Sequence, residues 1–201
     1  MKWKKKRIRQ RHKIKVIMIG EVEVEDSIMV MNVCSEQDIV AVGEFYDDVV
    51  KHLCENINYP KWVYKVYPSE DSVREMTEAE CQFMCIDNQK GVGAFVLNDD
   101  PQGKYENAVW SRQLSEGEYM VCHTLATEPL MRGKGIGRQI VEYCIDYAKS
   151  HGFKAIRLDV VPDNIPAKKL YEKCGFRYVG DVDLEREIDE IPLFSMYELN
   201  F

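Results

Sequence analysis

The stretch between residues 123 and 149 contains glycines and bases whose types and spacing could bind a phosphate ester. Three glycines and three bases fall within seven residues: Arg132, Gly133, Lys134, Gly135, Gly137 and Arg138. Glycine lets a backbone approach a ligand closely and turn successive amides toward it. A helix that begins here would add about half a positive charge at its N-terminus. The sequence therefore predicts a pyrophosphate site.

Two common phosphate-binding loops do not fit this stretch. The P-loop pattern GxxxxGK[ST] fails because no Ser or Thr follows Lys134. The dinucleotide pattern GxGxxG fails because Arg138 stands where the third glycine is needed. A tight strand-to-helix turn without a ligand is the alternative interpretation of the glycines.

Three blocks of sequence resemble the GNAT superfamily of acetyl-coenzyme A-dependent N-acetyltransferases. The family signature [QR]-x-x-G-x-[GA] matches residues 132–137 at every fixed position. Residues 125–129 resemble its L-A-V-x-P strand end, with Thr127 in place of valine, and residues 164–176 resemble its N-x-x-A-x-x-L-Y-x-x-x-G-F block. The resemblance is strongest over residues 118–179.

This resemblance implies a single domain of the α+β class over residues 28–201, with a central, mostly antiparallel, splayed sheet flanked by helices. In this fold the backbone of three strand residues would pair with pantetheine, and Asn164 would lie beside that arm. The three strand residues are Leu125, Ala126 and Thr127. The implied pyrophosphate site consists of Arg132, Gly133, Lys134, Gly135, Ile136, Gly137 and Arg138.

The implied activity is transfer of an acetyl group from acetyl-coenzyme A, as co-substrate and without a metal, to a primary amine of a small molecule or peptide. The amine would attack directly in a ternary complex. Tyr171 matches the family's general acid, which reprotonates the departing thiolate. A phenol with a pKa of about 10 needs positioning to protonate a thiolate whose conjugate acid has a pKa of about 8.5. Core packing is the alternative role for Tyr171.

Two residues are candidates for the base that takes a proton from the amine. His123 lies on a predicted strand, and period-two alternation predicts that it shares a face with Leu125 and Thr127. An imidazole with a pKa of about 6.5 suits this step, although a structural histidine is the alternative. Glu118, earlier on the strand, could act through water. An α-amine, with a pKa of about 8, would need no strong base.

The acceptor pocket is predicted between the N-terminal helices and two aromatic loops. Candidate walls are Trp62, Tyr64, Tyr105 and Trp110. Core packing is again the alternative role. An acidic surface would favour a cationic acceptor by electrostatic steering.

The elements that must position these groups follow from hydrophobic periodicity. Predicted helices cover residues 35–54, 69–80, 136–151 and 165–173. Predicted strands cover residues 27–33, 81–87, 92–98, 118–127, 155–161, 176–182 and 193–199, with a hairpin turn at 88–91. Because strands outnumber helices in a mixed order, we expect one α+β domain around a mixed sheet.

The charge of the chain is distributed unevenly. The 201 residues carry a net charge of −7, yet residues 1–20 hold nine of the 27 Lys and Arg and no acid. The remainder has 18 bases against 34 acids, a balance of −16. We therefore expect residues 1–27 to form a basic N-terminal extension, and an acidic body that repels nucleic acid. No apolar run is long enough to span a membrane, so no membrane partner is expected.

The seven cysteines are scattered, form no CxxC pair and do not cluster with the four histidines. This pattern indicates reduced, buried thiols in a cytoplasmic protein, without a zinc site or disulfides.

Two other functions remain open. A non-catalytic acyl-coenzyme A-binding or sensor module would keep the glycine turn but would need no acid at Tyr171. A nucleic-acid-associated protein would use the basic segment 1–20 and acetylate a protein partner. The resemblance is also compatible with a homodimer, for which the sequence fixes no interface.

Overall fold

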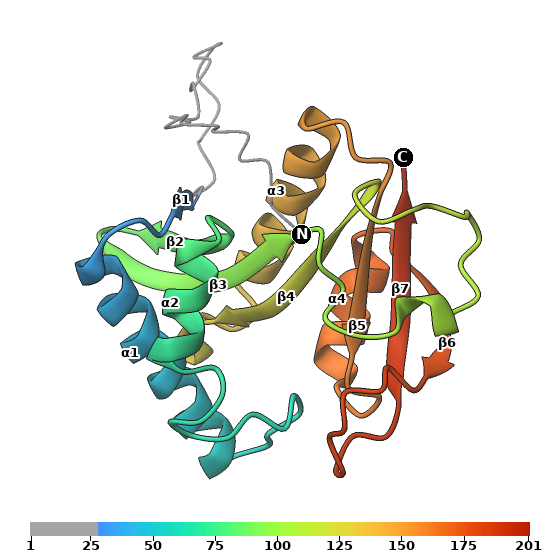
Figure 1. Ribbon diagram of the computed structural model, residues 1–201. Helices are drawn as coiled ribbons and strands as arrows, with labels where there is room; N and C mark the ends of the chain where they lie inside the picture. The colour runs from blue at the N-terminus through green and yellow to red at the C-terminus, as the bar shows by residue number, and fades with distance from the viewer. Residues whose placement is uncertain (1–27) are drawn as a thin grey trace.

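The computed structural model describes residues 28–201, and the predicted basic extension lies outside them. Seven strands form one sheet in the order β1-β2-β3-β4-β5-β7-β6 (Figure 1). Within residues 28–201, only β4 and β5 are parallel neighbours. The strands are β1 Met29–Asn32, β2 Gln82–Asp87, β3 Lys90–Asn98, β4 Tyr119–Thr127, β5 Ala155–Val160, β6 Arg177–Val182 and β7 Phe194–Asn200. The predicted α+β fold with a mixed, mostly antiparallel sheet is confirmed.

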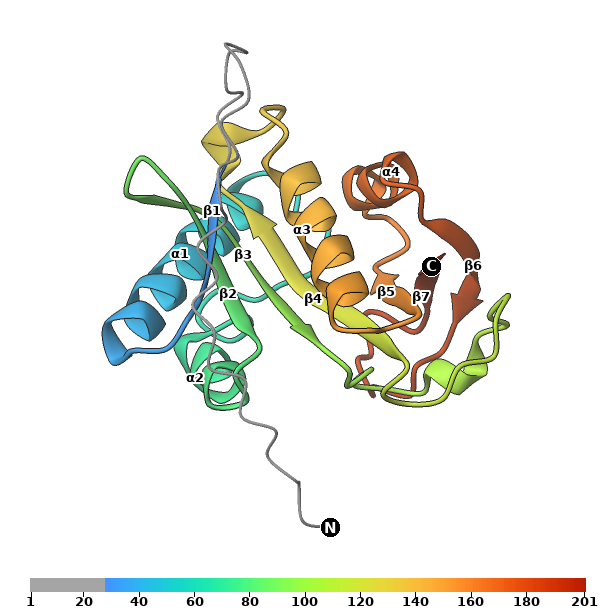
Figure 2. The same cartoon turned by 90° about the horizontal axis from the view of Figure 1, so that it is seen from above.

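Helices cover both faces of the sheet, as Figure 2 shows. The helices are α1 Glu36–Glu55, α2 Glu70–Glu78, α3 Ile136–Ser150 and α4 Ile165–Lys173. Helices α1 and α2 lie on one face, and α3 and α4 on the other. None of the helices within residues 28–201 has the length and apolar character needed to cross a bilayer.

Local sequence signals explain where the first two helices begin. The side chain of Ser35 accepts a hydrogen bond from the amide of Asp38, whose carboxylate accepts one from the amide of Ser35. Ser69 and Ser72 form the same reciprocal arrangement at α2. Each cap satisfies amides that the first helical turn leaves free, and contributes about 1 kcal/mol.

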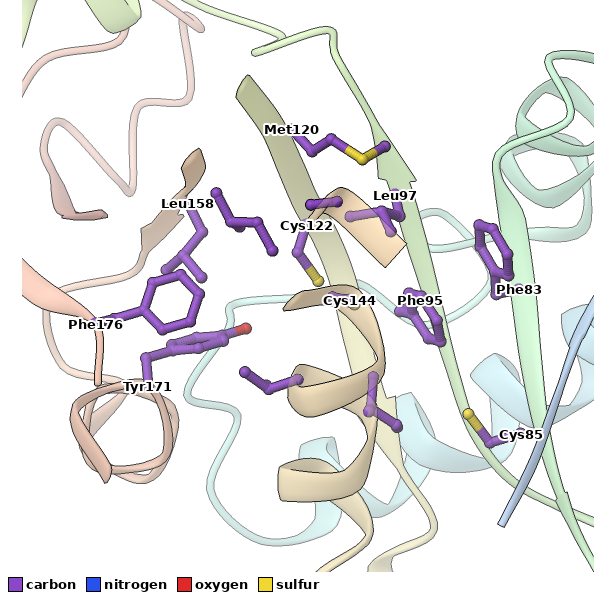
Figure 3. Packing of buried hydrophobic residues seen from close by; sticks show 14 of the residues in the cluster. Phe83, Cys85, Phe95, Leu97, Met120, Cys122, Cys144, Leu158, Tyr171 and Phe176 are labelled. Atoms are coloured by element: carbon purple, nitrogen blue, oxygen red, sulfur yellow. The ribbon is translucent and has the colours of Figure 1, made fainter. Parts of the chain in front are cut away.

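Alternation along β3 divides the core into two layers. Phe95 and Leu97 point toward α3. On this face Phe95 stacks on Phe83 of the neighbouring strand β2, with ring centroids 5.0 Å apart (Figure 3). Ala94 packs against α1 on the opposite face. The central strands are therefore buried on both sides.

The sheet opens between its two parallel strands. Strand β4 pairs with β5 only from Tyr119 to Val121, opposite residues 155–157. Beyond Val121 it continues to Thr127 alongside β3 alone, while β5 pairs with β7 along its whole length. A gap thus separates the C-terminal halves of β4 and β5, which confirms the predicted splay.

A β-bulge interrupts β4 within this diverging half. Ala94 pairs with Ala126, whereas Val96 pairs with His123, so β4 contains one extra residue opposite β3. Thr124 takes up the irregularity with a φ of 47°. The extra residue shifts the alternation by one position. Residues after the bulge therefore point to the opposite face from the one that regular alternation predicts from residues before it.

The bulge overturns one prediction about faces. His123 points toward α1 and α2, whereas Leu125 packs in the core beside α3. The predicted common face for His123, Leu125 and Thr127 was therefore wrong, because period-two alternation does not continue through a bulge.

All seven cysteines are free, but they are not all buried. Cys34 and Cys54 are exposed, which contradicts that part of the prediction, whereas Cys85, Cys122 and Cys144 lie in the core.

Candidate active site

The glycine turn between β4 and α3 presents an open backbone. Gly133 and Gly135 have φ values of 84° and 82°, in the left-handed region that favours glycine, and neither has another group near where a Cβ would be. Gly135 is the N-terminal cap of α3 and supplies no side-chain hydrogen bond. The backbone at both glycines is therefore open, and the first-turn amides of α3 have no side-chain cap, as an anion-binding helix start requires.

The other residues of the turn contribute in different ways. The Nε atom of Arg138 lies 2.8 Å from a carboxylate oxygen of Glu142. Arg132 and Lys134 are exposed and form no ion pair within residues 28–201. The side chain of Ile136 is buried in the core, so only its amide is available to a ligand.

Gly137 serves packing between the two helices of this face. A Cβ added there would lie 3.1 Å from a methyl carbon of Leu170 in α4. Its role in the structure is therefore to let α4 approach α3 closely.

Residues 125–127 offer a ligand their backbone edge. Strand β3 occupies one edge of this segment, and no strand within residues 28–201 pairs with the other. The side chains of Leu125 and Ala126 are packed in opposite cores, and that of Thr127 lies against Gly137. A ligand in the gap would therefore meet peptide groups rather than side chains, and threonine in place of valine is compatible with this.

Tyr171 reaches the gap from α4. Its ring packs against Phe176 at a centroid distance of 5.6 Å, and Figure 3 shows its hydroxyl pointing toward Cys122 and Cys144. That hydroxyl makes no hydrogen bond within the described part of the chain. Burial raises the pKa of Tyr171 well above its usual value, so the phenol keeps its proton at neutral pH.

Asn164 lies at the same end of the gap, four residues beyond β5. Its Oδ1 atom accepts a hydrogen bond of 3.2 Å from the amide of Ala167 and so caps α4. The side-chain carbonyl is thus already used, while the two Nδ2 hydrogens are available as donors.

His123 has a defined tautomer. Its Nε2 atom lies 2.9 Å from the carbonyl oxygen of Asp100. Because a carbonyl can only accept a hydrogen bond, Nε2 carries the hydrogen and Nδ1 keeps its lone pair. Burial lowers the pKa of His123 below its ordinary value, so the ring is neutral at pH 7.

Glu118 lies at the other end of β4. One residue before the strand begins, its carboxylate accepts hydrogen bonds from Lys154 and from the amide of Ser115. The hydrogen bond from Lys154 lowers the pKa of Glu118. About 30 Å of strand separates it from Thr127, so the structure does not bring Glu118 to the gap.

A pocket of about 330 Å³ opens on the α1/α2 face beside His123. Its lining residues are Tyr46, Tyr67, Pro68, Ser72, Glu75, Met76, Gln82, Val96, Asp100, Gln102, His123 and Thr124.

None of the four predicted wall residues lines this pocket. Tyr105 and Trp110 are buried in a separate core near β5 and β7. Trp62 packs edge-on against Tyr46 at 6.1 Å, and Tyr64 is exposed elsewhere on the surface. Tyr105 and Trp110 thus have the alternative role, core packing.

A buried ion pair between Asp159 and Arg186 connects β5 to the loop that carries Asp100. Two Arg186 nitrogens each lie 2.8 Å from an Asp159 oxygen, and the Tyr105 hydroxyl donates to the same carboxylate at 2.7 Å. Arg186 also donates to the carbonyl oxygens of Pro101 and Gln102. Burial alone would raise the pKa of Asp159, but hydrogen bonds from Arg186 keep it below its ordinary value.

Replacing Arg186 with methionine is expected to destabilise the protein by about 3 kcal/mol, because the largely buried Asp159 carboxyl would lose its cationic partner. Their side chains are only 19% and 11% exposed. Urea unfolding of R186M measures this loss, and the double variant D159N/R186M should recover part of it. The exposed Arg177, replaced by methionine, should change stability by no more than about 0.5 kcal/mol. An R186M variant as stable as the wild type would contradict the role of the pair.

The splayed sheet and the open glycine turn before α3 are together typical of one class of acetyltransferases. Residues 51–176 match the acetyltransferase (GNAT) family. The chain belongs to this family.

Individual relatives agree with that assignment. The chain is 37% identical over 93 residues to streptothricin acetyltransferase of Escherichia coli, which covers 46% of this chain and 49% of that protein. The chain thus spans about half the length of that relative.

Solved structures share the fold at low sequence identity. A GNAT-family acetyltransferase from Streptococcus agalactiae superposes with a TM-score of 0.70 at 14% identity, over 87% of this chain and 95% of that one. The protein yncA of Salmonella typhimurium, solved with its cofactor acetyl-CoA, gives a TM-score of 0.61 at 14% identity, over 87% and 94% of the two chains.

Proposed function

We propose that residues 28–201 form an acetyl-coenzyme A-dependent N-acetyltransferase that acetylates a primary amine by direct attack. The observation that carries this proposal is the pair of groups at the gap between β4 and β5. The Tyr171 hydroxyl points into the gap from the α3/α4 face, and His123 lies beside it on the α1/α2 face. Asp159 of β5 interacts electrostatically with both residues.

The chain's own groups fit the coenzyme. When bound, acetyl-coenzyme A supplies the acetyl group and a thiol leaving group. The open amides at Gly133, Gly135 and the start of α3 would hold its diphosphate, with Arg132 and Lys134 as exposed cations beside them. The unpaired edge of residues 125–127 would accept the amides of pantetheine in place of a strand.

Tyr171 is proposed as the general acid. Its raised pKa keeps the hydrogen in place, and its hydroxyl has no competing partner within residues 28–201. It can therefore donate that hydrogen to the departing thiolate on the same face of the sheet. A binding or sensor module would need no proton donor at this position.

His123 is proposed as the base. Its Nδ1 lone pair is available because Nε2 is committed to Asp100, and its lowered pKa keeps the ring neutral. The ring can thus take a proton from an incoming ammonium group, and Nε2–H bonded to the carbonyl keeps its orientation. Glu118 is not proposed for this role, because it lies at the far end of β4.

A screen for released coenzyme A tests the function. Polyamines, amino acids, aminoglycosides and peptides would be supplied one at a time with acetyl-coenzyme A, and products would be identified by mass spectrometry. We expect release that depends on an amine and yields its N-acetyl derivative. Tight binding of acetyl-coenzyme A without transfer to any of these amines would favour the sensor module instead.

Replacing His123 with glutamine is expected to lower kcat/KM about a hundredfold and to remove the acid limb of its pH profile. In the wild type, kcat/KM should fall as the pH drops through the His123 pKa, which lies below the ordinary 6.5, because the protonated ring cannot accept a proton. Initial rates across pH 5 to 9 measure both effects. The exposed His151, replaced by glutamine, is the control and should leave the profile intact. An unaltered profile in H123Q would remove His123 from the mechanism.

A further inference from the structure

The pocket beside His123 is negatively charged. Among its described lining residues, Glu75 and Asp100 carry charge and there is no lysine or arginine. Neither carboxylate forms an ion pair within residues 28–201. The nearby Arg186 cannot compensate them, because it is bonded to Asp159. A concave site lined by one sign of charge attracts ligands of the opposite sign.

The two carboxylates differ in the hydrogen bonds that they already accept from the protein. The Oδ1 atom of Asp100 accepts the amide of Gln102 at 2.9 Å, and its backbone oxygen holds His123. Glu75 is exposed on α2, and its carboxylate has no hydrogen bond within the described residues. Glu75 therefore has both carboxylate oxygens available to a ligand in the pocket, whereas one oxygen of Asp100 is already bonded.

Two buried polar side chains of the wall are already bonded to the protein. The Tyr46 hydroxyl donates to the carbonyl oxygen of Thr124 at 2.9 Å. The buried amide of Gln82 donates to the carbonyl oxygens of Phe83 and Phe95. These two side chains therefore need no ligand to satisfy their hydrogen bonds.

We propose that this pocket is the acceptor site and selects small amines that carry a second positive charge, with Glu75 as the specificity-determining residue. The inference rests on the proposed function. The reacting amine must lose a proton to His123 before it attacks, so it is neutral when it approaches the thioester. A second amine on the same molecule, which stays protonated at neutral pH, is then the group that Glu75 would balance. A carboxylate in its place would be repelled by Glu75 and Asp100.

The size of the pocket limits the acceptor. Its volume of about 330 Å³ lies at the small end of ligand sites. A short diamine or a single lysine-like side chain fits this space, whereas a folded surface does not.

Three probes with the same four-carbon chain and one shared amine test the inference: the diamine putrescine, the corresponding amino alcohol and the corresponding amino acid. In the wild type, kcat/KM should fall about tenfold from diamine to alcohol, and further from alcohol to acid. The preference for the diamine should weaken as ionic strength rises.

Two variants on the same helix complete the test. E75Q should reduce the diamine-to-alcohol ratio to about one, whereas E78Q, a matched exposed position on α2 outside the pocket, should keep the wild-type ratio. A ratio unchanged in E75Q, or a wild type that prefers the alcohol or the acid, overturns the inference while any acetylation upholds the proposed function.

Calorimetry of the same probes with the protein and coenzyme A separates the two proposals. Diamine-selective binding that E75Q abolishes upholds the pocket assignment even without acetyl transfer, in which case it is the proposed function that fails. Binding of none of the three probes overturns the pocket assignment.

Discussion

Replacing Gly135 with glutamate is expected to weaken acetyl-coenzyme A binding by about a hundredfold or more. Gly135 has a φ of 82°, which costs a residue with a Cβ roughly 1 to 2 kcal/mol. The new carboxylate would also stand at the start of α3, where the diphosphate is proposed to lie, and repel it. Isothermal titration calorimetry with acetyl-coenzyme A measures the loss.

The matched control for this variant is G117E. Gly117 has a φ of 78° and, like Gly135, has open space around the position of a Cβ. It lies just before β4, at the end of the strand away from the turn. The two variants therefore share the backbone strain and the added charge, and only G135E should lose affinity. Normal affinity in G135E, or an equal loss in G117E, would contradict the assignment of the turn.

Replacing Tyr171 with phenylalanine is expected to lower kcat by about a hundredfold or more, with the Kd for acetyl-coenzyme A changed by less than about twofold. The ring would still pack against Phe176 and Tyr197, so the variant loses the proton donor and little else. Because the pKa of Tyr171 is raised, its loss should be felt equally across the neutral and mildly alkaline pH range. Steady-state rates and calorimetry on the same preparation measure the two quantities.

Tyr197 offers a control from the same cluster. Its hydroxyl donates to the carboxylate of Glu172 at 3.1 Å and is thus already partnered. Y197F should lower stability slightly and leave kcat near the wild-type value. Wild-type turnover in Y171F, or an equal loss in Y197F, would show that the Tyr171 hydroxyl has no special role.

Features set by neighbouring residues could be predicted from the sequence. The capping residues Ser35 and Ser69 determine where α1 and α2 begin, and both helices lie where periodicity predicts them. The glycine turn before α3 was also predictable, because its conformation depends on residue types within a few positions.

Features set by contacts between distant segments could not be predicted. The bulge at Thr124 arises from the register between β3 and β4, so local alternation gave His123 the wrong face. The pair of Asp159 and Arg186 joins residues 27 positions apart. Nothing in the sequence near Arg186 distinguishes it from a solvated charge in an acidic loop. The pocket walls Tyr46 and Tyr67 likewise meet only when α1, α2 and β4 are assembled.

The sequence also did not show which part of the predicted strand 118–127 lies at the gap. Glu118 and His123 belong to the same predicted strand, and both types of side chain can accept a proton. The structure separates them by placing Glu118 beside Lys154 at the closed end of the sheet and His123 at the open end.

The three residue pairs that join β4 to β5 have a mechanical consequence for the whole molecule. Within residues 28–201 they are the strand pairing that connects two half-sheets, one formed by β1 to β4 and the other by β5 to β7, and α3 packs against both. A ligand that bonds to the free edge of β4 would serve as a surrogate strand wedged between the halves. Binding in the gap would thus also connect the two half-sheets, and it would raise the free energy of unfolding of the bound protein.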